Sequence, residues 1–98
     1  MEFKEQPDRI DIVLTGELDS RTSHKVKTEI LELLGDKKKD VYLDIREVRY
    51  IDSGAINLMI TLHKALLSRQ KKFFVASPSE TVSRILKLGN LDKVLNIV

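Results

Sequence analysis

The hydropathy pattern switches repeatedly between the period of a strand and the period of a helix, which narrowly limits the possible folds. Apolar and polar side chains alternate at residues 10–15 and 41–46, which predicts two strands with one buried face each. Thr15-Gly16 is expected to close the first strand. Helical spacing then begins at about Thr22 and stops at Gly35. A longer helix is expected from Ser53 to roughly Arg69.

The C-terminal third continues the alternation. Residues 72–76 are almost continuously apolar, which predicts a central strand covered on both faces. Ser77 can then cap a third helix, with Pro78 at its first position and Glu80 reaching back to the cap amide. The segment 91–98 is short and partly apolar, and it is expected to add a last helical turn or an edge strand.

Strands and helices that alternate in this way are typical of an α/β layer fold with crossover connections. One sheet of about four or five strands with three helices would account for nearly every apolar residue. A chain of 98 residues has too small a core to be subdivided, so we expect a single domain over residues 1–98.

Composition narrows the possible partners and compartments. The 17 basic and 15 acidic residues give a net charge of +2, so no nucleic-acid partner is expected. The one basic run, Lys37-Lys38-Lys39, is interpreted as a solvated turn after a helix end. The absence of cysteine excludes disulfides and thiolate metal sites, and it favours the cytoplasm. No stretch resembles a signal peptide or a membrane span, so no membrane insertion is expected.

Asp52-Ser53-Gly54 stands between a strand-like stretch and a long apolar run. Sites gather where strands end and helices begin, because backbone amides there point outward unpaired. One interpretation is structural: Ser53 caps the helix, and Asp52 is a second possible capping side chain. The other is that the Ser53 hydroxyl is presented for chemistry.

The helix that follows is apolar over more of its circumference than one sheet face requires. Leu58 and Ala65 lie to one side of the stripe through Ile56, Met59 and Ile60. The surplus is either buried inside the domain or offered to a partner. We expect burial by neighbouring helices, with a partner surface as the alternative.

A catalytic serine would need a nearby base, and His24 and His63 are the only histidines. On the predicted helix His63 lies about 15 Å from Ser53, which is beyond hydrogen-bond reach. His24 could approach only if the fold placed two helix starts together. No Gly-x-Ser-x-Gly elbow or phosphate loop is present. We therefore expect neither enzymatic activity nor a bound cofactor. The aspartates at 11, 19, 44 and 52 lack histidine or cysteine at ligand spacing, so no metal site is expected either.

Three stretches resemble the STAS domain family of anti-sigma factor antagonists, in order and over almost the whole chain. They are "TGELD", "VYLDIREVRYIDSGAINLMITLHKAL" and "SRILKLGNLDKVLNI". The resemblance implies a single STAS-like domain with a mixed sheet of about four to five strands packed against three to four helices.

The resemblance also implies a switch in transcription regulation. In that family a partner that is both serine kinase and anti-sigma factor phosphorylates the serine of the Asp-Ser pair. The unmodified protein binds this partner and releases the sigma factor. By position, Ser53 would be the phosphoacceptor, Asp52 the flanking acid and Asp19 the aspartate of a loop beside it. The expected partner-binding residues are Asp19, Asp52, Ser53, Gly54, Ala55, Ile56 and Asn57.

The sequence departs from the family pattern at one place. The family usually has serine or alanine after the Asp-Ser pair, whereas Gly54 follows Ser53 directly here, and Asn57 stands where a small residue is common. The alternative function is therefore a STAS scaffold or subunit of a signalling or transport assembly that is not phosphorylated. Under both hypotheses we expect a cytoplasmic protein-binding domain that is monomeric when free.

Overall fold

The computed structural model describes residues 1–98 as a five-stranded sheet with three α-helices. The elements in chain order are β1 (Glu2–Glu5), β2 (Arg9–Leu18), α1 (Ser20–Leu34), β3 (Asp40–Ile51), α2 (Ser53–Leu67), β4 (Phe73–Ala76), α3 (Glu80–Leu88), the 3-10 turn η1 (Leu91–Lys93) and β5 (Asn96–Ile97). The predicted α/β class and the predicted numbers of strands and helices are confirmed.

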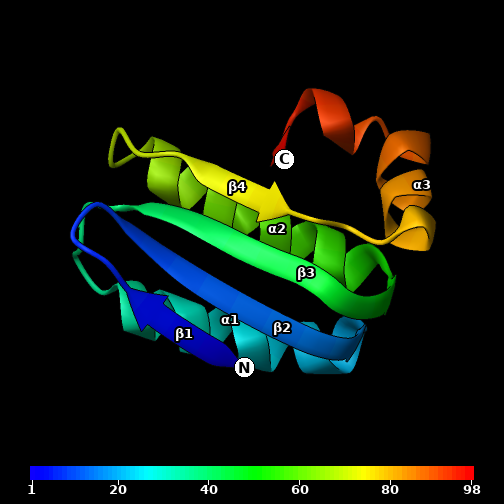
Figure 1. Ribbon diagram of the computed structural model, residues 1–98, viewed down its shortest axis with the longest axis horizontal. Coiled ribbons are helices and arrows are strands. Elements are labelled where there is room, and N and C mark those ends of the chain that lie inside the picture. Colours follow the sequence, from blue (N-terminus) through cyan, green and yellow to red (C-terminus); the bar gives the residue numbers. More distant parts are fainter.

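The sheet is mixed, with strands in the order β1-β2-β3-β4-β5. β1 runs antiparallel to β2, and every other neighbouring pair is parallel. In Figure 1, α1 and α2 lie together behind the sheet, and α3 lies beyond the end of β4. β2 and β3 are parallel neighbours, and a helix follows each of them at once. α1 and α2 therefore both start at the carboxyl ends of these strands, on the same side of the sheet's outline.

One apolar core fills the space between the sheet and its helices. It consists of 21 buried residues, and largely alternate side chains of β2 and β3 face it from the sheet. Leu58, Met59 and Leu62 of α2 are at most 1% exposed. The apolar surplus of α2 is therefore largely buried within the chain, as expected, although Leu67 remains 62% exposed.

Two strand predictions need correction. β2 does not close at Thr15-Gly16 but continues to Leu18, because its register with β3 shifts twice and Gly16 takes a positive φ of 85° there. β4 is an interior strand, as predicted, with β3 and β5 on its two sides, but it is not covered on both faces, because only Phe73 and Val75 are buried. Phe74 instead stacks on Tyr42 of β3, with ring centroids 4.4 Å apart.

Two helix starts also differ from the prediction. α1 begins at Ser20 rather than near Thr22. α3 begins after Ser79, whose hydroxyl accepts a hydrogen bond from the Val82 amide at 3.2 Å. Ser77 is not the cap, because it adopts a left-handed φ of 56° as the chain turns out of β4. Its amide bonds to the Val98 carbonyl at 3.0 Å, which ties this turn to the C-terminal residue.

The basic run between α1 and β3 is not simply a solvated turn. Lys37 and Lys39 form ion pairs with Glu5 of β1 at 2.9 and 2.6 Å. Residues 91–98 supply both elements that were considered, the turn η1 and the edge strand β5.

Candidate functional site

Asp52, not Ser53, caps α2. Its carboxylate accepts hydrogen bonds from the backbone amides of Gly54 at 2.8 Å and Ala55 at 3.4 Å. Asp52 keeps the extended backbone of a cap residue, with φ −126°, whereas Ser53 is already the first residue of the helix. Asp52 is therefore the residue of the Asp-Ser pair that caps the helix, and the Ser53 hydroxyl takes no part in capping.

The same carboxylate also binds the start of α1. The backbone amide and the hydroxyl of Ser20 donate to Asp52 Oδ2 at 3.0 and 3.1 Å. Partial desolvation raises the pKa of Asp52, but the hydrogen bonds from the Gly54 and Ser20 amides outweigh it and lower that pKa overall. One ionised side chain thus joins two helix starts that are 32 residues apart in sequence.

Asp19 caps α1 in a reciprocal capping box with Thr22. Its carboxylate accepts from the Thr22 amide at 3.0 Å, and the Asp19 amide donates to the Thr22 hydroxyl at 3.0 Å. The bond from the Thr22 amide lowers the pKa of Asp19, and the Arg21 guanidinium at 3.2 Å adds to this effect. Asp19 directly precedes Ser20, the residue that bonds to Asp52, so both acids cap helices that meet at this point.

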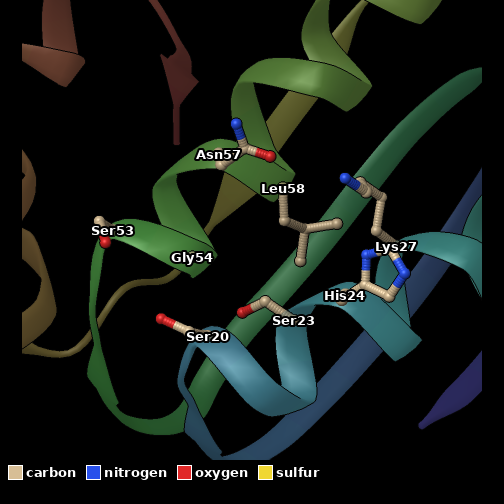
Figure 2. Close-up of a pocket in the computed structure, with 8 residues that line it drawn as sticks. All are labelled: Ser20, Ser23, His24, Lys27, Ser53, Gly54, Asn57 and Leu58. Carbon is tan, nitrogen blue, oxygen red and sulfur yellow. The ribbon is translucent and has the colours of Figure 1, made fainter.

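Ser53 lies exposed on the first turn of α2, and its hydroxyl forms no hydrogen bond with the rest of the chain. Figure 2 shows it at one end of a group of side chains from both helices. Tyr50, three residues earlier at the end of β3, is 51% exposed. The exposed hydroxyl of Ser53 and the exposed ring of Tyr50 are both accessible to a second protein.

At Gly54 the backbone of α2 lies close against the backbone of α1. A Cβ atom built on this residue would lie 2.6 Å from Ser20 Cα, a distance that real side chains do not adopt. The glycine that departs from the family pattern therefore has a packing role in this chain. It allows the backbone of α2 to touch the backbone of α1.

The remaining predicted residues differ in their accessibility. Ala55 is completely buried, so its side chain belongs to the core rather than to a partner surface. Ile56 is half-buried and packs against that core. Asn57 is exposed one turn above Ser53, on the side that faces α1.

A cleft of about 450 Å³ opens between α1 and α2 beside the contact at Gly54. Ser53, Gly54 and Asn57 line it from α2, and Ser23, His24 and Lys27 line it from α1. Ser23 and Lys27 carry no signal in the sequence, because no local pattern shows that this face of α1 meets α2.

The fold does place the two helix starts together, which is the arrangement that a catalytic pair of Ser53 and His24 would need, and His24 lines the same cleft as Ser53. In Figure 2, however, Ser53 and His24 lie at opposite ends of the group, with Ser23 and Leu58 drawn between them. Neither His24 nor His63 hydrogen-bonds to Ser53, so the serine has no base beside it.

Comparison with known proteins agrees with this geometry. A family model of the STAS domain matches residues 1–98. The chain belongs to the STAS domain family. This STAS domain is 33% identical to an anti-sigma-B factor antagonist of Listeria monocytogenes serovar 1/2a, over 99% of its own length and 86% of the relative's.

Solved structures share the fold. A candidate anti-sigma factor antagonist from Thermotoga maritima superposes with a TM-score of 0.90 at 28% identity, over 98% of this chain and 83% of that one. SpoIIAA, an anti-sigma factor antagonist, gives a TM-score of 0.75 in its unphosphorylated form, over 99% of this chain and 86% of SpoIIAA. Its phosphorylated form gives the same score over 89% of that chain, and each is 15% identical, which shows the fold alone.

These relatives place the STAS domain among the anti-sigma factor antagonists, a regulatory rather than a catalytic group. None of its helices has both the length and the apolar character that a membrane crossing requires.

Proposed function

We propose that this STAS domain is a phosphorylation-switched antagonist of an anti-sigma factor, with Ser53 as the phosphoacceptor. The observation that carries the proposal is the exposed, unbonded hydroxyl of Ser53 at the first position of α2, directly after the capping Asp52. A hydroxyl with a structural role would be bonded to the backbone, and here Asp52 has that role. The unmodified domain would bind a partner that is both serine kinase and anti-sigma factor, and so release the sigma factor.

The proposed partner surface consists of Asp19, Tyr50, Asp52, Ser53 and Asn57. All five lie at or near the common start of α1 and α2, and none of them is fully buried. Exposed aromatic side chains such as Tyr50 are enriched at protein interfaces. Ala55 and Gly54 support this surface from below, because one fills the core and the other sets the spacing of the helices.

Phosphorylation should prevent docking without unfolding the domain. A phosphoserine carries up to about two negative charges at neutral pH, and the amino-terminal end of a helix tolerates them. At an interface the same charges would be desolvated beside the carboxylates of Asp52 and Asp19, which are ionised at neutral pH and whose pKa values lie below the ordinary value. The fold of SpoIIAA is found in both its unphosphorylated and its phosphorylated form, which supports a switch that leaves the fold unchanged.

The first experiment asks whether Ser53 is the acceptor. The domain is incubated with its candidate kinase and ATP, and intact mass and peptide mapping locate the phosphate. We expect a single phosphate on Ser53 in the wild type and none in Ser53→Ala. Phosphate on another residue, or no phosphate with a kinase shown to be active, would refute the switch.

The second experiment isolates charge from size. Ser53→Asp and Ser53→Asn differ by one carboxylate and have nearly the same shape. We expect Ser53→Asp to weaken partner binding at least about tenfold, equivalent to about 1.4 kcal/mol, whereas Ser53→Asn and Ser53→Ala stay closer to the wild type. Calorimetry at two salt concentrations measures the effect. Equal binding by the Asp and Asn variants would rule out charge repulsion as the mechanism.

A further inference from the structure

Ser23 holds the only polar side chain among the 22 buried residues, and it lies in the cleft between α1 and α2. The residue is 2% exposed, and its hydroxyl has no hydrogen-bond partner in the structure. Figure 2 draws this hydroxyl turned away from the body of α1, toward the side of the cleft that Ser20 and Gly54 occupy. A buried hydroxyl without a partner is unfavourable, so a ligand that accepts a hydrogen bond from it would be stabilised there.

The charge around the cleft selects an anion. Lys27 and His24 line it, and no carboxylate does. Lys27 forms no ion pair, and Figure 2 shows its side chain extending toward the turn of α2 that carries Asn57. Asp52 bonds the cleft residues Ser20 and Gly54 and its charge opposes an anion, but four hydrogen bonds from Ser20 and the α2 amides already occupy its oxygens.

We propose that this cleft binds a tetrahedral oxyanion of the phosphate class. Lys27 supplies the charge, Ser23 donates its hydroxyl at the base of the site, and the side-chain amide of Asn57 can donate from the facing helix. The phosphate could be a free ion or the phosphoryl group of a modified Ser53, which lines the same cleft. Only the second source rests on the proposed function.

The first experiment uses the unmodified protein and inorganic phosphate. Amide resonances of the ¹⁵N-labelled domain are followed during titration with phosphate and, separately, with sodium chloride at equal ionic strength. We expect saturable shifts at Ser23, His24 and Gly54 with phosphate only. Lys27→Gln should weaken the apparent Kd about five- to tenfold, as loss of one charge-assisted hydrogen bond predicts.

Lys25→Gln is the matched control, because Lys25 is exposed on the same helix but does not line the cleft. It should change the Kd less than about twofold. Ser23→Ala should weaken binding while the thermal melt shows that the domain still folds. Absence of saturable shifts, or equal effects of the Lys25 and Lys27 variants, would overturn the proposal.

A second arm distinguishes the two sources. Phosphoserine is installed at position 53 by semisynthesis, so the result does not depend on any kinase. If the Ser53 phosphate occupies the cleft, added inorganic phosphate no longer shifts these resonances, and Lys27→Gln raises the second pKa of the phosphoserine in a ³¹P titration. Unchanged binding of inorganic phosphate would instead assign the cleft to the free ion.

Discussion

At the scale of single residues, the Asp-Ser pair divides two tasks between neighbouring side chains. Asp52 satisfies the amides at the start of α2 and also holds Ser20 of α1, whereas Ser53 bonds to nothing. The structure therefore depends on the side chain of Asp52, and the Ser53 hydroxyl has no structural role.

This division predicts that substitutions at Asp52 and Ser53 have different effects on thermal stability. Asp52→Ala removes the cap and the link to α1, and we expect the Tm to fall by about 4–8 °C, the effect of losing one good cap in a domain of this size. Ser53→Ala removes no bond and should change the Tm by less than about 2 °C. Thermal melts followed by circular dichroism measure both, and Asp36→Ala, an exposed acid without a side-chain bond, is the control. A larger loss in Ser53→Ala than in Asp52→Ala would contradict this division.

At the scale of elements, the site depends on how closely α1 and α2 approach each other. Their first turns touch at Gly54, and the cleft opens beside this contact. The two helices follow parallel neighbouring strands, so their starts meet at one edge of the sheet. The packing of α1 on α2 thus sets the spacing between Asp19, Ser20 and Asp52.

Gly54→Ala tests this contact. Alanine normally stabilises a helix relative to glycine by up to about 1 kcal/mol. Here the added methyl group would overlap the Ser20 backbone, so we expect the substitution to lower the free energy of unfolding by about 1–3 kcal/mol, the usual cost of overpacking.

Gly89→Ala is the matched control for that substitution, because its nearest neighbour is the flexible side chain of Leu91 at 3.7 Å, an ordinary contact. It should leave the unfolding free energy within about 0.5 kcal/mol of the wild type. Urea denaturation measures both variants. A stabilised Gly54→Ala protein would show that the helices do not approach as closely as the structure has them.

At the scale of the whole molecule, ion pairs connect the edge of the sheet to the loop between α1 and β3. Glu5 of β1 binds both Lys39 and Lys37, whose hydrogen bonds lower the pKa of its carboxyl group from 4.5 to about 2. The pKa values of Asp19 and Asp52 are lowered as well, by the amides they cap. All three acids bind a proton less readily in the folded chain than in the unfolded one.

The stability of the domain should therefore depend on pH in acid. Because the unfolded state binds more protons, the contribution of Glu5 is complete above about pH 5 and is lost as the pH falls from 4.5 towards about 2. Urea midpoints between pH 6 and pH 3 measure the decline. Glu5→Gln should be less stable than the wild type at pH 6, and the gap should narrow at pH 3. Glu2→Gln on the same strand is the control, and parallel curves for the Glu5 variant and the wild type would contradict the ion-pair account.

The sequence by itself determined the order and type of the elements from β2 to α3, since hydropathy period depends only on which face of each segment is buried. No hydropathy pattern marks β1, because all four of its residues are exposed. Prediction from the sequence also failed where a local signal had two possible uses. Ser77 and Ser79 both suit a cap, and only the left-handed turn out of β4 decides for Ser79. Gly16 resembles a strand end, but pairing with β3 carries β2 past it.

The candidate site was only half determined in this way. The sequence singled out Asp19, Asp52 and Ser53, because motif positions are visible along one chain. The tertiary structure decided that Asp52 bonds Ser20, that Gly54 fits against α1 and that Ser23 and Lys27 face α2. These contacts join residues about 30 positions apart through the packing of two helices on a parallel sheet, and no spacing within either segment encodes that meeting.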